Sequence, residues 1–482
     1  MVESEGRKRG ERDRMRRMSV HEVDAISPNR APQPPGRHEV NLAPWRARHQ
    51  HDSGTRRPFS ERLSRACGNQ RRMSATRQLL REPEELALAA PPASLGVDVQ
   101  DTGCAHARKL PHRSRQRKAR GVNGSRRPPP ILLPMLDVPL RRVCIVMMSA
   151  VGDTVHVLPV LNALKRRTPS VHITWVLQPG PAALVRGHRQ VDSIVLFDRA
   201  KGWGAFGEVR RALAMREFDL VIDLQVYFKA GIVTSFTRAP VKLGFDRARA
   251  RDLNWLFTTH RIPPHEPQHV QDQYFEFLTE LGIPADPIEW GLGPWPAERA
   301  WQRTFFSKFD RPTAAIVVAT SKPQKDWPPE RWADVADALY ADFGLQPVLV
   351  GGQSPRELHA ERVIMERAKQ KPVSALGSGL RNLVGILDGS DLVLSPDTGP
   401  LHIAVALDRP TISLLGYMNP KRTGPYRRSH DLMIDAYGDA GEDYPISMAH
   451  RAGRMQRISV RDVLDRVDRW NASRTATRTR RG

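Results

Sequence analysis

The sequence predicts an α/β protein of two doubly wound, Rossmann-like domains that face a cleft, preceded by a disordered basic segment. From Arg141 onward, short apolar runs alternate with longer stretches of helical periodicity, which is typical of a parallel sheet with crossover helices. The alternation occurs twice, before and after a stretch rich in Pro, Gly and Trp at residues 284–298. Residues 1–134 lack the pattern and are rich in Arg, Pro and Ser.

In the first half, apolar runs bounded by polar residues are expected to be buried strands. They lie at residues 142–148, 172–177, 193–197 and 218–224. Helical patterns separate these runs or follow the last of them, at residues 156–167, 180–187, 203–216 and 270–282. We therefore predict an N-terminal Rossmann-like domain at residues 141–290.

The second half repeats the architecture without an obvious sequence repeat. Its expected strands are residues 314–320, 347–350, 391–396 and 410–416. Helical patterns lie at residues 328–344, 354–369 and 459–470. The sequence thus predicts a second Rossmann-like domain at residues 298–470, followed by a basic tail at residues 471–482. Ligands of such domains bind at loops that leave the carboxyl ends of strands.

The formal charge of +23 raises nucleic acid or a membrane surface as a partner. Residues 1–134 hold 28 Lys and Arg against 14 Asp and Glu, so most of the excess lies there. Such a segment cannot bury enough apolar surface to offset its ordering entropy, and we expect it to be disordered. It is either an upstream extension before a natural start at Met135 or a functional arm; mass spectrometry of the native N-terminus distinguishes the two.

The sequence predicts a cytoplasmic protein that can visit a membrane surface peripherally. No run reaches the roughly 18 apolar residues of a membrane span, and the first residues lack the apolar core of a signal peptide. The three cysteines, Cys67, Cys104 and Cys144, provide neither a disulfide framework nor metal-ligand spacing. His265 and His269 are four residues apart, but Pro267 between them makes a shared helical face for a metal improbable.

The first candidate site is the turn that follows the first strand, "SAVGD". Gly152 permits close backbone approach, and Asp153 begins a helix. Asp153 is either an N-cap, which accepts hydrogen bonds from unpaired amides, or a general base for an acceptor hydroxyl. The turn lacks the GxGxxG pattern of ordinary dinucleotide binding.

The second and third candidate sites follow strands of the second half. Thr320 and Ser321 can donate to phosphate oxygens, and Lys325 adds a mobile positive charge; the alternative is a solvated loop in which nearby tryptophans pack. Asp397, Thr398 and Gly399 open a helix, whose N-terminus favours anions, although they can also be caps. No GxxxxGK[ST] is present, which excludes a P-loop.

These motifs, taken in order, resemble glycosyltransferase family 9. The segments that carry the resemblance are "IVMMSAVGDTVHVLPVLNALKRRTP", "DLQVYFKAG", "KLGFDRARARD", "ATSKPQKDWPPERW" and "SPDTGPLHIAVALDRP". They span Arg141 to Trp470 and are most similar to the heptosyltransferase I group of lipopolysaccharide heptosyltransferases. The resemblance implies a GT-B fold, with the donor in the C-terminal domain and the acceptor in the N-terminal one.

The resemblance also implies roles for individual residues. Asp153 matches the proposed catalytic base, with Ser149 and Gly152 beside it on the acceptor side. Lys325 matches the lysine of the K-x-W-P motif that contacts the donor diphosphate. Other matches at the donor site are Thr320, Ser321, Asp397, Thr398, Gly399 and His402, and the weaker acceptor-side matches are Lys229 and Arg251. Two departures stand out: "GYMNPKRTGP" replaces the usual glycine-proline, and Gln353, Ser354 and Glu357 compete for the acidic ribose position.

The reaction implied is inverting, metal-independent transfer of a heptose from ADP-heptose to the Kdo–lipid A inner core. It needs no cofactor beyond the nucleotide sugar, and the acceptor is an acidic, lipid-linked glycan at the cytoplasmic face of the inner membrane. Two alternatives remain open. One is a family-9-type transferase that uses another nucleotide sugar for a different cell-surface glycan. The other is a nucleic-acid-binding protein that acts through its basic arm, with salt-dependent, sequence-independent binding.

Overall fold

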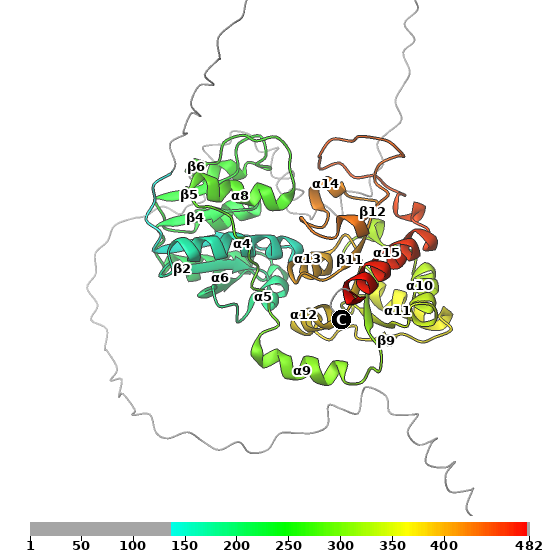
Figure 1. Ribbon diagram of the computed structural model, residues 1–482. Coiled ribbons are helices and arrows are strands. Elements are labelled where there is room, and N and C mark those ends of the chain that lie inside the picture. Colours follow the sequence, from blue (N-terminus) through cyan, green and yellow to red (C-terminus); the bar gives the residue numbers. More distant parts are fainter. Residues whose placement is uncertain (1–135, 480–482) are drawn as a thin grey trace, which may run out of the picture. The chain divides into compact units, whose positions relative to one another are not determined.

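The computed structural model describes residues 136–479, which form two six-stranded parallel sheets with helices on both faces (Figure 1). The first sheet has the strand order β3-β2-β1-β4-β5-β6 and the second β12-β11-β10-β7-β8-β9. Read from opposite ends, both orders are the 3-2-1-4-5-6 order of a Rossmann domain. The predicted disorder of residues 1–134 lies outside the described residues.

The strands of the first sheet are β1 (Arg142–Val146), β2 (His172–Leu177), β3 (Ser193–Leu196), β4 (Leu220–Asp223), β5 (Val241–Gly244) and β6 (His260–Arg261). The helices of this half are α4 (Val151–Arg167), α5 (Pro179–Val185), α6 (Trp203–Ala214), α7 (Phe228–Ser235) and α8 (Val270–Glu280), with 3-10 turns η4 (Arg199–Lys201) and η5 (Asn254–Phe257). Each strand except β3 and β6 is at least half buried, as the near-continuous apolar runs require.

The strands of the second sheet are β7 (Thr313–Val317), β8 (Gln346–Val350), β9 (Val373–Ser374), β10 (Leu392–Pro396), β11 (Thr411–Leu415) and β12 (Ile434–Asp435). The helices are α9 (Pro296–Phe306), α10 (Pro329–Ala341), α11 (Pro355–Arg367), α12 (Leu380–Gly389), α13 (Gly399–Ala406), α14 (Pro420–Thr423) and α15 (Val460–Thr479), with 3-10 turns η6 (Pro323–Lys325), η7 (His430–Leu432) and η8 (Met455–Arg457).

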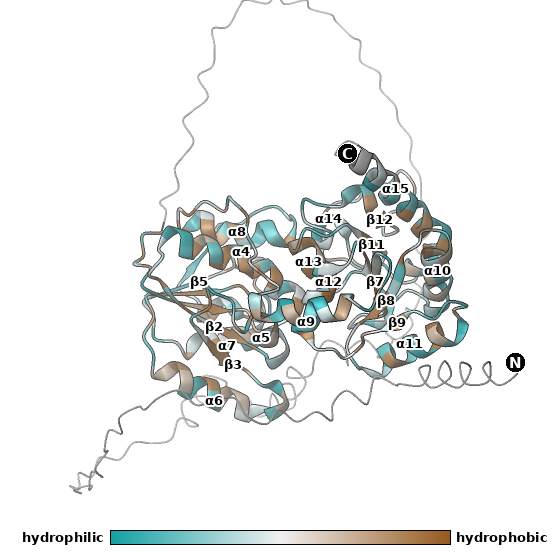
Figure 2. Cartoon of the chain, turned by 60° about the horizontal axis from the view of Figure 1, so that its bottom comes forward, coloured by the Kyte–Doolittle hydropathy of each residue, from teal (hydrophilic) through white to brown (hydrophobic). Residues whose placement is uncertain are grey.

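The buried side chains form a core on each face of the sheets, and hydrophobic residues gather on the strands and on the helix faces that cover them (Figure 2). Trp175, Trp327 and Trp332 are among the largest side chains that are fully buried. The indole N–H of Trp175 donates to Met147 O at 3.2 Å, which removes the cost of burying that polar group. No helix within residues 136–479 is both long and apolar enough to cross a bilayer.

Several predicted boundaries are wrong by a few residues. The first helix begins at Val151 rather than residue 156, because the turn after β1 leads directly into helical backbone. The stretch predicted to be a linker ends inside α9, since Pro296 is well suited to the first turn of a helix. The predicted basic tail from residue 471 continues α15 as far as Thr479, and Arg474 pairs with Asp391 at 3.0 Å.

Candidate active site

The N-termini of α4 and α13, one from each half, pack against each other. A Cβ atom on Gly152 would lie 2.7 Å from Cδ2 of His402, and one on Gly399 would lie 2.9 Å from Cγ1 of Val151. The two glycines therefore permit a close approach that any side chain would obstruct. The contact brings the turns that follow β1 and β10 to one place.

Asp153 is the third residue of α4, so the prediction that it could be the N-cap is wrong. Ala150 occupies that position, and Oδ2 of Asp153 accepts a hydrogen bond from the Ala150 N–H at 3.0 Å. Oδ1 accepts a second one from the Tyr274 hydroxyl at 3.2 Å. The carboxylate thus caps the helix from within the first turn, and two hydrogen bonds fix its orientation.

Burial raises the pKa of Asp153 above that of an ordinary aspartate. The hydrogen bonds from Ala150 and Tyr274, and the nearby positive charges of Arg422 and Lys325, act in the opposite direction without cancelling the burial. A carboxylate whose pKa moves toward neutrality is a better proton acceptor at working pH. Tyr274 stays protonated, because burial first and then Asp153 raise the pKa of its phenol well above the usual value.

Lys325 and Asp397 form an ion pair across the loops that follow β7 and β10. Nζ of Lys325 lies 2.8 Å from Oδ2 of Asp397 and 3.4 Å from its carbonyl oxygen. Thr423 Oγ1 lies 3.5 Å from the same Oδ2, and His402 Nε2 lies 3.8 Å from Oδ1. Thr398 takes the N-cap position of α13 with no side-chain cap bond, and Gly399 is the first helical residue. The arrangement holds a lysine at the positive end of a helix.

Three histidine rings lie in a row beside the contact between α4 and α13, with His156 between His402 and His269. The ring centroids of His156 and His402 are 4.5 Å apart, and those of His156 and His269 are 5.7 Å apart. Burial, reinforced by the charges of His269 and Lys325, lowers the pKa of His402 to about 3. His402 is therefore neutral at physiological pH and adds no charge to the site. His265 and His269, for which the sequence makes a shared helical face improbable, do not lie on one helix: His269 is the N-cap of α8, whereas His265 is exposed in the preceding loop.

The loop after β7 uses some of its predicted phosphate ligands internally. The Thr320 hydroxyl donates to Lys322 O at 2.7 Å and accepts from Lys322 N–H at 3.1 Å, and its donation to phosphate stays a prediction. Ser321 is exposed on the same loop. Trp327 and Trp332 are buried with their rings at 4.6 Å, as the packing alternative predicted.

On the acceptor side, the structure places the predicted residues on two neighbouring segments. Lys229 lies in the first turn of α7. Arg251 lies just before η5, where its backbone N–H donates to Val226 O at 2.7 Å and Nη2 lies 3.1 Å from Sδ of Met448 in the second half. Ser149 O accepts from Nε2 of Gln225 at 3.0 Å. Gln225 therefore connects the turn that carries Asp153 to the end of β4.

Several residues at this contact were not predicted from the sequence. Tyr274 reaches it from α8, far from every candidate motif. His156, Gln225, Arg422 and Thr423 lie within segments quoted above, but no role was predicted for them. Only Gln225 carried a signal, because it follows a strand by two residues. The others lie within helices or long loops, where a single sequence gives no indication of what they face.

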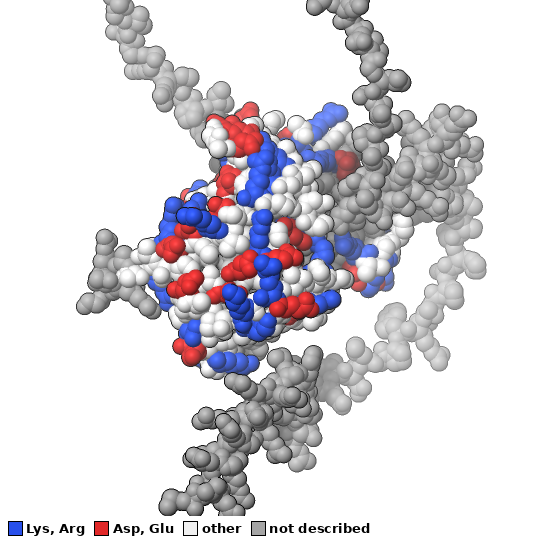
Figure 3. Space-filling model, turned by 90° about the vertical axis from the view of Figure 1, so that its right-hand side faces the viewer, with Lys and Arg blue, Asp and Glu red and all other residues white. Residues whose placement is uncertain are grey.

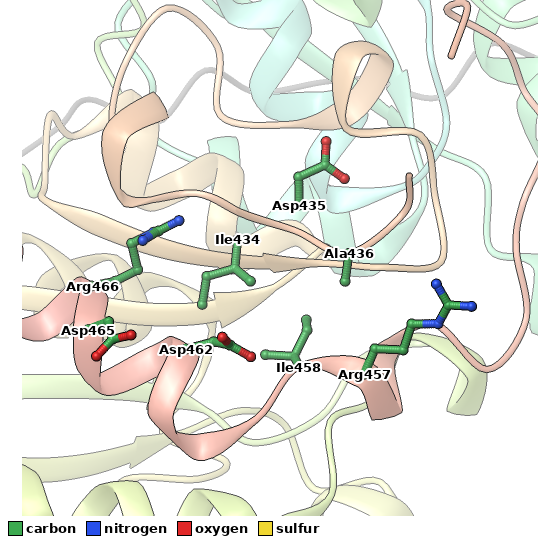
Figure 4. Close-up of a pocket in the computed structure, with 8 residues that line it drawn as sticks. All are labelled: Ile434, Asp435, Ala436, Arg457, Ile458, Asp462, Asp465 and Arg466. Atoms are coloured by element: carbon green, nitrogen blue, oxygen red, sulfur yellow. The ribbon is translucent and has the colours of Figure 1, made fainter. Parts of the chain in front are cut away.

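A pocket lies away from this contact, between β12 and the start of α15 (Figure 4). It has a volume of about 300 Å³ and is lined by Ile434, Asp435, Ala436, Arg457, Ile458, Asp462, Asp465 and Arg466. Its lining has three Asp and two Arg side chains, so its net charge is small, and none of these residues is a predicted site residue. Within residues 136–479 no cluster of three or more His, Cys, Asp or Glu has the arrangement of a metal site.

Comparison with known proteins gives one consistent result. A family model described as glycosyltransferase family 9 (heptosyltransferase) matches residues 206–442. The lipopolysaccharide core heptosyltransferase OpsX of Haemophilus influenzae is 30% identical over 306 residues, which cover 63% of this chain and 87% of that protein. Lipopolysaccharide heptosyltransferase 1 of Escherichia coli K12 is 28% identical over 302 residues, covering 60% and 92%.

Solved structures agree on the fold. The E. coli heptosyltransferase WaaC with ADP is 25% identical with a TM-score of 0.54, covering 70% of this chain and 99% of that one. A family 9 glycosyl transferase from Veillonella parvula is 20% identical with a TM-score of 0.60, at the same coverage. The predicted GT-B fold, two Rossmann-like domains around one site, is thereby confirmed.

Proposed function

This chain belongs to glycosyltransferase family 9, and we propose that it moves a heptose from ADP-heptose to the Kdo–lipid A inner core of lipopolysaccharide. That it is a glycosyltransferase follows from the family. The choice of sugar and acceptor rests on the names of its relatives, which are lipopolysaccharide core heptosyltransferases, and on WaaC, solved with ADP and with ADP-2-deoxy-2-fluoro heptose. We place the reaction at the cytoplasmic face of the inner membrane.

The observation that carries the proposal is the meeting of Asp153 with the Lys325–Asp397 pair at the facing ends of α4 and α13. A sugar transferase needs a base on the acceptor side and positive charge on the leaving-group side. The start of α4 carries the carboxylate, and Lys325 of the opposite half, paired with Asp397 just before α13, carries the positive charge. The anomeric carbon would lie between them.

In the proposed reaction, Asp153 takes the proton of the acceptor hydroxyl as its oxygen attacks the anomeric carbon from the side opposite the diphosphate. The C–O bond to the nucleoside diphosphate breaks, and the anomeric configuration inverts. Lys325 shifts from Asp397 toward the departing phosphates, whose negative charge grows in the transition state. The amides at the start of α13, including that of Gly399, and the Ser321 hydroxyl add donors there.

The remaining predicted residues have supporting roles in this proposal. Asp397 holds Lys325 in place before the donor arrives, Thr398 occupies the N-cap position of the anion-binding helix, and neutral His402 fills the space behind Gly152. Lys229 and Arg251 would meet the acidic groups of the acceptor. We propose that the lysine and the helix provide the stabilisation that a divalent cation provides in other transferases.

Calorimetry with ADP, UDP and GDP tests the donor, and transfer from ADP-heptose to a Kdo–lipid A acceptor tests the reaction. Preferential binding of ADP together with transfer supports the proposal. Preference for UDP or GDP would contradict the heptosyl assignment and favour a family-9-type enzyme for another glycan. Nuclear magnetic resonance of the product reports the anomeric configuration, and activity after exhaustive chelation reports the metal requirement.

A further inference from the structure

Apolar side chains gather on the surface formed by α7 and η5, named here the α7–η5 patch. It comprises Tyr227, Phe228, Leu253 and Leu256, whose exposed fractions are 42%, 38%, 54% and 56%. These are four of the nine large hydrophobic side chains that are exposed within residues 136–479. A patch of this kind on a soluble domain marks an interaction surface.

The patch is a single built surface. The rings of Phe228 and Phe257 meet edge to face at 5.4 Å, and Nδ2 of Asn254 donates to Tyr227 O at 3.0 Å. Leu253 has φ 63° and ψ 20°, the left-handed region that disfavours residues with a side chain. The fold thus holds an apolar side chain toward solvent in a strained conformation, which is characteristic of functional sites.

Positive charge surrounds these apolar side chains. Residues 225–265 hold seven Lys and Arg against two Asp, one of which, Asp246, is buried against Arg249. The exposed guanidinium groups of Arg247 and Arg261 lie 4.2 and 5.7 Å from the ring centroid of Trp255. Aromatic and basic side chains that alternate in this way are typical of a protein surface at a membrane interface.

Another face of the molecule has a different charge pattern. On the side where α10, α11 and α15 lie, Lys and Arg alternate with Asp and Glu in a mixed surface (Figure 3). Ion pairs such as Arg367–Asp334 contribute to this mixture. The excess of positive charge around the α7–η5 patch is therefore not shared by this face of the second half.

The patch is connected to the proposed base through Tyr274. The Tyr227 hydroxyl is close enough to Tyr274 to contribute to its raised pKa, and Tyr274 donates to Asp153. Arg251, which precedes Leu253 by two residues, contacts Met448, itself 45% exposed. A partner surface bound to this patch would therefore lie on the side from which the acceptor hydroxyl is proposed to reach Asp153.

We propose that the α7–η5 patch docks the enzyme on a bilayer with anionic headgroups. Tyr227, Phe228, Leu253 and Leu256 enter the interface between headgroups and acyl chains, and Arg247 and Arg261 pair with lipid phosphates. The inference rests on the proposed function, because a lipid-linked acceptor is the substrate that such docking would serve. Docking keeps the acyl chains in the bilayer while the sugar reaches Asp153.

Co-sedimentation of the full chain with vesicles tests the docking. The probes are vesicles of phosphatidylethanolamine with phosphatidylglycerol, compared with phosphatidylcholine alone. We expect Leu253→Ser with Leu256→Ser to weaken binding at least about tenfold, since two exposed leucines leave the interface, and Arg247→Gln to weaken it roughly fivefold at low salt. The matched control, Leu196→Ser with Leu358→Ser, removes leucines of similar exposure elsewhere and should bind like the wild type.

Measurements at high salt distinguish binding by the patch from binding by the basic residues 1–134, which are the same in all variants. High salt screens purely electrostatic binding, so the difference between the leucine variant and its control should persist there. The docking proposal is overturned if the wild type ignores anionic vesicles. It is also overturned if the leucine variant binds like the wild type, or if the control variant weakens binding equally.

Activity on two forms of the acceptor separates docking from the proposed function. With a de-acylated, water-soluble acceptor, the leucine variant should keep the wild-type kcat, whereas with acceptor embedded in vesicles its rate should fall about tenfold. Loss of activity on both forms would instead make the two leucines part of the fold or of the site, contrary to the proposal. Absence of heptosyl transfer by the wild type would contradict the proposed function, while the vesicle experiment would still decide the docking.

Discussion

The two halves of the molecule share one strand order, and in each the fourth strand leads to an aspartate with very different partners. Asp223 ends β4 and Asp397 directly follows β10. Asp397 pairs with the cation of Lys325, which comes from the loop after β7, the first strand of its half. Asp223 is fully buried and has only neutral donors, namely Thr234, Asn254 and the backbone of Gln225.

The same contrast between charged and neutral partners is found where the loop after the fourth strand meets the loop after the first strand of each half. In the second half, a single ion pair joins the two loops, and such a lysine can exchange its carboxylate for a phosphate. In the first half, Gln225 joins them, because its Oε1 accepts from Met148 N–H at 3.0 Å and its Nε2 donates to Ser149 O at 3.0 Å. One fold therefore holds an ion-paired lysine on the proposed donor side and a hydrogen-bonded carboxylate, Asp153, on the proposed acceptor side.

Replacing the hydrogen-bonded carboxylate should have the largest effect. Asp153→Asn removes the proton acceptor and keeps the size of the side chain, so we expect kcat to fall roughly 10²- to 10⁴-fold. Donor affinity, measured by calorimetry with ADP, should remain near the wild-type value, because the proposed donor-binding residues lie in the other half. Turnover close to that of the wild type would contradict the base assignment.

The pH dependence of the wild-type enzyme gives an independent measurement of the same group. Asp153 must be ionised to accept a proton, and burial raises its pKa. The rate should therefore fall on the acid side at a higher pH than the value near 4 of an ordinary aspartate. The acid limb should be lost from the residual activity of Asp153→Asn.

Removing the ion-paired lysine should have the second largest effect. Lys325→Ala should cost about 2–4 kcal/mol of transition-state stabilisation, by analogy with the loss of one oxyanion donor. Single-turnover kinetics at saturating donor would measure this loss in the chemical step. Lys322→Ala, a change of an exposed lysine in the same loop, is the matched control and should leave the rate near that of the wild type. Equal rates for the two variants would contradict the role of Lys325.

The sequence predicted more of the fold than of the site, and the reason is the range of the interactions. Buried strands such as β2 are continuous apolar runs, which one sequence displays directly. β9 and β12 have two residues each, and only their neighbours in the sheet define them. Asp153 and Lys325 could be proposed as site residues because they lie in loops after strands and match motifs of the family. Tyr274 could not, because it reaches Asp153 from a helix 121 residues away.

Breaking the amide connection in the first half should have a smaller effect. Gln225→Ala leaves the Met148 N–H without its acceptor and loosens the turn that positions Asp153, so kcat should fall about tenfold, the equivalent of one hydrogen bond. The KM for the donor should not change, since no donor group is touched. Gln370→Ala, at an exposed glutamine of the second half, serves as control. A lower melting temperature with an unchanged kcat would mean that Gln225 is merely structural.

Asp223→Asn should have the smallest effect on the reaction. It directly tests how the buried Asp223 of the first half differs from its ion-paired counterpart, Asp397. Burial raises the pKa of Asp223 to about 7, against the hydrogen bonds from Asn254, Thr234 and Gln225. Between the unfolded value near 4 and about 7, the folded protein keeps a proton that the unfolded chain has lost. Wild-type stability should therefore fall as pH rises through this window, and the slope should disappear in the variant. Melting temperatures at about pH 5 and about pH 7.5 measure it, and an unchanged slope would mean that this carboxyl does not titrate there.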